Sequence, residues 1–413
     1  MDYQIKLDFN RRPSSVMHID LNSCFASIEQ QANPLLRDKP IAVAAYDTPN
    51  GCILAASTQA KLLGIKVGLR VKEGRLLCPD LIVRSPDSDK YRAVHLALRN
   101  LLSGYTPKIT PKSIDEFVLD FSGTPALQKG IFAVGQEIKN RIKKEIGDYL
   151  TVSIGLGPNR FLAKTASNLH KPDGLDEINK DNAFKIYRSL NLMDLNGINR
   201  QNAIRLNAVG IYTVMDFFNA DLSLLRVAFH SILGYYWFLR LRGWEIDDID
   251  WDTKSFGHSY SLPKFLTTSE EIAPILSKLV EKVGFRMRQA NFQARGIHLA
   301  LLYKNNQYFH EGKSLDQPVF DSRDIYRFAY RLLRHSPYHL PVRNIAVSCF
   351  GLSPRSTIQL DLFCDNLRKD SLVTAIDSIN DRWGNFVITP ATMANTEDFV
   401  HDRIGFGQIR SLI

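Results

Sequence analysis

The sequence predicts an α+β protein built from two β-α-β-β-α-β units with an all-helical module between them. Three observations support this fold class. Short apolar strands alternate with amphipathic helices over the first 175 residues, short helical segments follow, and a second run of strands and helices begins at Lys254. A chain of 413 residues also exceeds what one hydrophobic core usually organises, so we expect two or more domains.

The first unit begins with a short buried strand that ends in an acidic residue. Residues 16–20 form this strand, and a helix over 22–33 follows, with Asn22 or Ser23 as its cap. After a long insertion we expect a strand over 117–121, a helix over 127–147 and a strand over 150–157. The insertion contains strands over 40–46 and 52–57 and helices over 58–65 and 89–105. Without the insertion, the order is ferredoxin-like.

A compact helical module begins near Gly174, and glycine turns at Gly197-Ile198 and Gly210-Ile211 are expected to join its helices. The second unit then alternates strands and helices. We expect strands over 254–262, 295–303, 307–313 and 342–350, and helices over 268–290 and 322–336. Beyond Ser353 the chain is more polar and is expected to be a tail. One helix there is indicated by apolar residues at helical spacing, namely Leu372, Ile376, Ile379 and Trp383.

Charge and composition favour a nucleic-acid partner. The formal net charge is +9 and the sequence pI is about 9.2, and counterion release makes such a surface suited to phosphates. Basic residues outnumber acidic ones in the second unit. No apolar run approaches the roughly 20 residues that cross a bilayer, and the N-terminus lacks the apolar core of a signal peptide. Five cysteines lack zinc or disulfide spacing. We expect a cytoplasmic protein without a membrane partner.

Three acidic residues are the sharpest candidates for chemistry. Asp115 and Glu116 are adjacent at the start of an apolar strand, where a charge is costly unless it is paired or binds a metal ion. Asp20 ends the first strand and would face the same point if the two strands are neighbours. Because successive strand residues point to opposite faces, Asp115 and Glu116 must lie at a turn or bulge, and Pro111 and Lys112 favour a hairpin start. Three hard oxygen ligands would suit two Mg²⁺ ions about 3.5 to 4 Å apart.

Four long motifs occur in order within the first 175 residues, namely MHIDLNSCFASIE, GCILAASTQAKLLGIKVG, SIDEFVLDF and SIGLGPNRFLAKTASNLHKPDG. With them the chain resembles the Y-family translesion DNA polymerases of the bacterial polymerase IV/V type. The resemblance implies a right-hand polymerase. Its parts would be a ferredoxin-like palm over 1–175 with small fingers inserted at about 22–108, a helical thumb over 176–250, a β-α-β-β-α-β little finger over 251–352 and a C-terminal tail over 353–413.

The same resemblance implies roles for single residues at a metal site. Asp20, Asp115 and Glu116 would ligate two Mg²⁺ ions, and the backbone carbonyl of Leu21 would be a further ligand. A helix-hairpin-helix at Gly197-Ile198-Asn199 in the thumb would hold a phosphate of the primer or template through backbone amides.

Four residues would contact the incoming nucleotide, namely Phe25, Thr58, Lys61 and Lys164. Lys164 and Lys61 would bind the triphosphate. Phe25 would be a steric gate whose ring blocks a ribose 2′-hydroxyl. Thr58 stands where many members of the family carry a tyrosine that touches the phosphates.

A short motif after the second unit suggests a protein partner. Residues 359–363, with the sequence QLDLF, resemble the pentapeptide by which bacterial polymerases dock on the sliding clamp. Leu360, Leu362 and Phe363 would fill an apolar groove, and Gln359 would hydrogen-bond its rim.

These expectations combine into one function, with two alternatives. The chain would be a monomeric, template-directed DNA polymerase of the lesion-bypass type that adds dNTPs to a primer with low fidelity and has no proofreading domain. A catalytically silent relative that acts as a DNA and clamp adaptor is the first alternative, although the three carboxylates and Lys164 are all present. A nucleotide cyclase that shares the palm topology is the second, and it would have no use for a thumb, a basic second unit or a clamp peptide.

Overall fold

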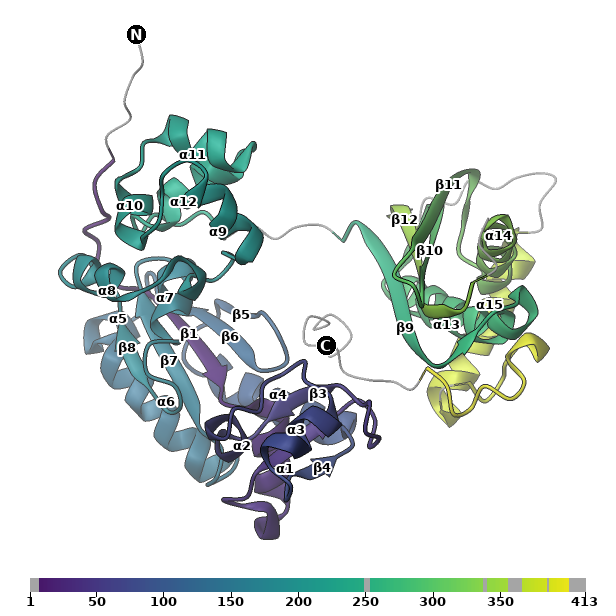
Figure 1. Cartoon of the computed structure of the whole chain (residues 1–413), viewed down its shortest axis with the longest axis horizontal. Helices are drawn as coiled ribbons and strands as arrows, with labels where there is room; N and C mark the ends of the chain where they lie inside the picture. The colour runs from purple at the N-terminus through teal and green to yellow at the C-terminus, as the bar shows by residue number, and fades with distance from the viewer. Residues whose placement is uncertain (1–6, 249–252, 337–339, 356–365, 385, 401–413) are drawn as a thin grey trace. The chain divides into compact units, whose positions relative to one another are not determined.

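The computed structural model describes residues 7–248, 253–336, 340–355, 366–384 and 386–400. The chain divides near residue 250 into two compact units. In Figure 1 the first unit runs from purple to teal and the second from green to yellow. Within these described ranges, no helix is long and apolar enough to cross a membrane.

A five-stranded sheet forms the centre of the first unit, in the order β5-β6-β1-β7-β8. Its strands are β1 (Val16–Leu21), β5 (Ile109–Pro111), β6 (Glu116–Asp120), β7 (Val152–Gly157) and β8 (Leu175–Glu177). The middle strand, β1, pairs antiparallel with both β6 and β7. All six residues of β1 are buried.

Successive side chains of β1 point to opposite faces of this sheet. The helices that pack on it are α1 (Cys24–Ala32), α4 (Ser88–Ser103), α6 (Ile131–Glu145) and α7 (Arg160–Ala166). The odd-numbered residues of β1 belong to the main core, which they share with α1, α4 and α6. Val16 instead packs with Ala163 of α7. The even-numbered His18 and Asp20 therefore share the face that α7 covers.

The expected strands of the first unit are confirmed, but one local prediction is wrong. The helix expected over 127–147 is broken into α5 (Ala126–Lys129) and α6, because Gly130 between them has a φ of 84°. Ser23 does stand at the N-cap of α1, but its backbone is left-handed and its side chain makes no cap hydrogen bond. Its hydroxyl instead accepts a hydrogen bond from Lys61.

The inserted segment has a three-stranded sheet in the order β3-β2-β4 and a small core of its own. Its elements are η1 (Pro34–Leu36), β2 (Ile41–Ala44), β3 (Ile53–Ala56), α2 (Thr58–Leu62), α3 (Val71–Leu77) and β4 (Ile82–Arg84). The strands and helices expected at 40–65 are confirmed, whereas α3 and β4 were not anticipated because both are short.

The helical module packs around the fully buried Trp237. Its helices are α8 (Ala183–Ser189), η2 (Leu192–Asp194), α9 (Arg200–Asn207), α10 (Val214–Asn219), α11 (Leu222–Phe229) and α12 (Leu233–Arg240). The two expected glycine turns are present, because Gly197 and Gly210 have φ values of 97° and 83° and lie shortly before α9 and α10. Neither conformation suits a residue with a β-carbon.

The second unit is a four-stranded antiparallel sheet in the order β11-β10-β12-β9 that packs on two helices. Its elements are β9 (Ser255–Leu266), α13 (Ser269–Gln289), β10 (Phe292–Tyr303), β11 (Tyr308–Val319), α14 (Ser322–His335) and β12 (Val342–Pro354). The β-α-β-β-α-β order expected for this unit is therefore confirmed.

Residues 366–400 pack on this second unit, although the sequence suggested a tail. They contain α15 (Asn366–Trp383) and η4 (Ala391–Met393). The guanidinium of Arg288 on α13 donates two hydrogen bonds, of 2.7 and 2.8 Å, to the carboxylate of Asp377 on α15. Lys278 and Lys282 donate to the backbone carbonyls of Thr396 and Val400. These partners lie about 90 to 120 residues apart in the sequence, so the polar composition alone could not reveal them.

We predict that Arg288→Gln loosens α15 from the second unit. Removal of the guanidinium leaves the partly exposed carboxylate of Asp377 without its counter-ion, and hydrogen bonds to a charged group typically contribute about 1.5 to 3 kcal/mol. Hydrogen exchange of the α15 amides should accelerate, whereas Arg382→Gln, at an exposed position on the same helix, should leave it unchanged. Equal exchange in the two variants would show that the ion pair does not hold the helix.

Candidate active site

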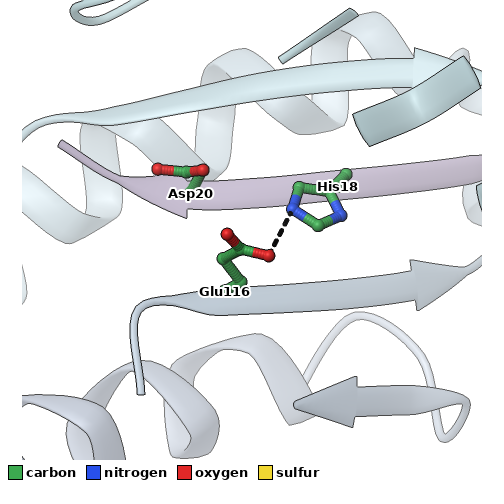
Figure 2. Close-up of side chains that lie close together, drawn as sticks. All are labelled: His18, Asp20 and Glu116. Atoms are coloured by element: carbon green, nitrogen blue, oxygen red, sulfur yellow. Dashed lines mark ion pairs between the residues drawn. The ribbon is translucent and has the colours of Figure 1, made fainter. Parts of the chain in front are cut away.

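Two of the three candidate carboxylates are brought together by strand register. Asp20 on β1 is the pairing partner of Glu116 on β6, and Ser153 on β7 lies on the other side of Asp20. Residues that face each other across an antiparallel pair point to the same side of the sheet. Figure 2 shows Asp20, Glu116 and His18 close together, with a dashed line between His18 and Glu116.

Asp115 lies at the turn just before β6, as the alternation argument required. β5 and β6 form the expected hairpin, and Asp115 immediately precedes β6. The carbonyl of Asp115 accepts a hydrogen bond from the Leu21 amide (2.9 Å), and its carboxylate accepts one from the Ser113 hydroxyl (2.5 Å). Burial and the charges of Asp20 and Glu116 raise the pKa of Asp115. A cation between these groups would relieve that repulsion.

Two lysine amines form ion pairs with these carboxylates. Lys164 Nζ lies 2.6 Å from Asp20 Oδ2 and 2.8 Å from Glu116 Oε1. Lys171 Nζ lies 2.7 Å from the same Asp20 oxygen. Although burial opposes its charged form, the charges of Asp20 and Glu116 raise the pKa of Lys164. Burial also works against ionised Glu116, but its contacts with His18 and Lys164 lower its pKa to about 2. Lys164 and Glu116 are therefore both charged at neutral pH.

Lys164 reaches the carboxylates because α7 lies directly against β7. A β-carbon at Gly155 would stand 2.0 Å from the carbonyl oxygen of Ala163 and 2.2 Å from the amide nitrogen of Ser167. Only glycine allows so close an approach of helix and strand backbones. The start of α7 is fixed by Asn159, whose side chain accepts a hydrogen bond from the Leu162 amide.

Lys171 was not singled out from the sequence, although it lies within the HKPDG part of a quoted motif. It comes from the loop after α7, and this loop is tied to the end of β1. Asn22 accepts a hydrogen bond from the Asp173 amide (2.8 Å) and donates one to the Ser153 hydroxyl (2.9 Å). These contacts could not be predicted from the sequence, because they join residues about 130 to 150 positions apart.

His18 was also missed, although strand periodicity could have indicated it. It lies two residues before Asp20 on a strand and so shares its face. Its Nε2 is buried and stands 3.4 Å from Glu116 Oε2, without a hydrogen bond of standard geometry. Burial lowers the pKa of His18, so the ring is neutral at pH 7.

The remaining nucleotide-site candidates lie in α1 and α2. Phe25 is 1% exposed, and its ring stacks on that of Tyr91 with centroids 4.3 Å apart. Lys61 donates a hydrogen bond of 2.8 Å to the Ser23 hydroxyl. Desolvation and the charge of Lys171 lower the pKa of Lys61, which places its amine within electrostatic reach of the same site. Thr58 is the half-buried first residue of α2.

The donor set fits a divalent cation. One ligand atom from each of His18, Asp20 and Glu116 lies within 4.8 Å of the others, and Asp115 adds a further carboxylate. Carboxylate oxygens are the ligands that Mg²⁺ prefers. The two amines now neutralise the charge that a metal ion would neutralise. The clamp-motif residues Gln359, Leu360, Leu362 and Phe363 lie outside the described residues.

Comparisons with known proteins agree with this geometry. Residues 19–168 match the impB/mucB/samB family, and residues 253–362 match the C-terminal domain of the same family. The chain is 35% identical to DNA polymerase IV of Moorella thermoacetica over 91% of this chain and 94% of that protein. It is 31% identical to DNA polymerase IV of Pelotomaculum thermopropionicum over 94% and 98% of the two chains.

A solved structure shares the fold. A Y-family polymerase chimera of Dbh and Dpo4 superposes with a TM-score of 0.72 over 81% of this chain and 98% of that chain, at 24% identity. This likeness supports the right-hand arrangement of sheets and helices alone. Together with the polymerase IV relatives, which match nearly the whole chain, it shows that the chain belongs to the Y family of lesion-bypass DNA polymerases.

Proposed function

We propose that Asp20, Asp115, Glu116 and the backbone carbonyl of Leu21 hold two Mg²⁺ ions at which this polymerase adds dNTPs to a primer 3′ end. Polymerases of this family use divalent metal ions. The observation that carries the proposal is the pairing of Asp20 with Glu116 across β1 and β6, with Asp115 at the turn that leads into β6. The carboxylates of Asp20 and Glu116 lie close together there, and their charges act on Asp115.

The metal ions would activate the attacking 3′-hydroxyl and stabilise the pyrophosphate leaving group. Two lysines near the carboxylates would change partners when a metal ion binds. Lys164 and Lys171 now contact Asp20, and they must leave it when a metal ion binds. The triphosphate of the nucleotide would then be their nearest anionic partner, with Lys61 as a third amine close by. The lysines thus hold the carboxylates in place without metal and bind phosphates with it.

Phe25 would exclude ribonucleotides, because packing holds its ring in place. It lies in the first turn of α1, directly after the strand that carries Asp20, and the stacked Tyr91 ring supports it from behind. The Tyr91 hydroxyl is itself fixed by a 2.9 Å hydrogen bond to Glu29. Thr58 would contact the phosphates from the start of α2.

Residues 1–175, 176–250 and 251–352 would act as palm with fingers, thumb and little finger on primer-template DNA. Support comes from the net charge of +9 and from the left-handed Gly197 turn, where backbone amides could meet a phosphate. The chain would act as a monomer that docks on the bacterial sliding clamp through residues 359–363. This peptide lies between Arg355 and α15, and Arg355 forms an ion pair with Asp370 of α15. The silent-adaptor alternative has no supporting observation, and the chain retains all three carboxylates.

The double variant Asp115→Ala plus Glu116→Ala should lose primer extension by about a thousandfold or more, because two metal ligands are removed. Extension of a primed template with dNTPs and Mg²⁺ measures the effect. Asp120→Asn, four residues along the same strand, is the matched control and should retain activity. Undiminished extension by the double variant would falsify the site.

Phe25→Leu should raise the use of rNTPs relative to dNTPs by about tenfold or more, because the smaller side chain leaves room for a 2′-hydroxyl. Single-nucleotide incorporation kinetics with both substrates give the ratio. Phe121→Leu changes another fully buried phenylalanine of the same core and controls for loss of packing. A ratio that is equal in both variants would mean that Phe25 is only a core residue.

Leu362→Ala plus Phe363→Ala should weaken binding to a purified bacterial sliding clamp by about tenfold or more, because two apolar anchors are lost. Calorimetric titration of the full chain into the clamp checks this. Clamp-independent extension of a short primer should be unaffected, and so should clamp binding by Leu367→Ala, a nearby residue that is 65% exposed. If the double variant binds the clamp as tightly as the wild type, the peptide is not part of the interface.

A further inference from the structure

We propose that His18 is a positioning residue that fixes the Glu116 carboxylate for metal binding by donating its Nε2–H to Glu116 Oε2. The inference rests on the proposed metal site at Asp20, Asp115 and Glu116. In this proposal His18 acts through Glu116 and is not itself a metal ligand.

The geometry comes from strand pairing. His18 and Asp20 are alternate residues of β1, and both face α7. Glu116 is the register partner of Asp20, so its side chain can lean along the sheet toward either residue. In Figure 2 the Glu116 carboxylate lies between the two, and the His18 ring points at it. The distance from Nε2 to Oε2 is 3.4 Å.

The two oxygens of Glu116 have different partners. Oε1 accepts a hydrogen bond from Lys164, and Oε2 faces His18. Lys164 must leave when a metal ion takes its place. A carboxylate with no other contact would then be free to rotate, and ordering it again would cost part of the binding free energy.

His18 can supply the contact that remains. Its side chain is 4% exposed, compared with 18% for Lys164, and it extends from the central strand of the sheet. A buried polar atom without a hydrogen-bond partner is destabilising, and His18 Nε2 is such an atom in this structure. Closing the 3.4 Å gap to a standard hydrogen bond of about 2.9 Å would satisfy it and hold Oε1 toward the metal ion.

Metal affinity without DNA or nucleotide tests the proposal apart from catalysis. Free Mn²⁺ would be titrated by electron paramagnetic resonance against the full-length wild type, His18→Leu and His18→Gln. Loss of a residue that orients a metal ligand typically costs about 10-fold or more in affinity, so His18→Leu should bind Mn²⁺ about tenfold more weakly. The amide of glutamine can donate from nearly the same place as Nε2, so His18→Gln should recover most of that loss.

A double-mutant cycle separates positioning from packing. If His18 acts through Glu116, His18→Leu should have no further effect on Mn²⁺ affinity in a Glu116→Gln background. An equal loss in both backgrounds would overturn the proposal in favour of a structural role, and failure of His18→Gln to recover affinity would also count against it. A directly bound nitrogen, seen as strong ¹⁴N coupling to Mn²⁺, would overturn it as well. If the wild type bound no Mn²⁺ at all, the proposed metal site itself would fail, which is a distinguishable result.

Discussion

The antiparallel register of β1 against β6 is the constraint on which the site depends. It sets Asp20 opposite Glu116 and leaves Asp115 at the turn just before β6, where the charges of Asp20 and Glu116 raise the pKa of its carboxyl. A slip of one residue would turn Asp20 to the apolar face and expose Met17, Ile19 and Leu21 to the α7 side. The apolar core that fixes the register therefore also fixes which residue lies opposite Glu116. The same six residues of β1 supply the apolar side chains of one face and Asp20 on the other.

Close packing of α7 on β7 is the second requirement. The missing side chain of Gly155 lets the helix backbone lie against the strand, and this brings the Lys164 amine onto Asp20 and Glu116. Repulsion among the carboxylates is thereby balanced before any metal ion arrives. The arrangement explains opposite electrostatic effects at neighbouring residues, since contact with His18 and Lys164 lowers the pKa of Glu116 while burial raises that of Asp115.

Patterns with local causes could be predicted from the sequence, and contacts across long separations could not. Periodicity predicted β1, β6, β7 and every strand and helix of the β-α-β-β-α-β second unit, and the conflict between alternation and a shared site predicted the β5–β6 hairpin. Gly130 was included in one long helix because its positive φ has no periodic signature. Lys171 was missed because its contact with Asp20 depends on how a loop returns to the sheet, and His18 because a buried histidine resembles a core residue. The docking of α15 was missed because the Arg288–Asp377 pair joins residues 89 positions apart.

Anomalous diffraction from a crystal of the full chain with primer-template DNA, a nonreactive dNTP analogue and Mn²⁺ tests the central claim most directly. The account predicts metal peaks bound by carboxylate oxygens of Asp20, Asp115 and Glu116, with the amines of Lys164 and Lys171 moved away from Asp20. Metal peaks at other residues, or both lysines still on Asp20 beside a bound nucleotide, would contradict it.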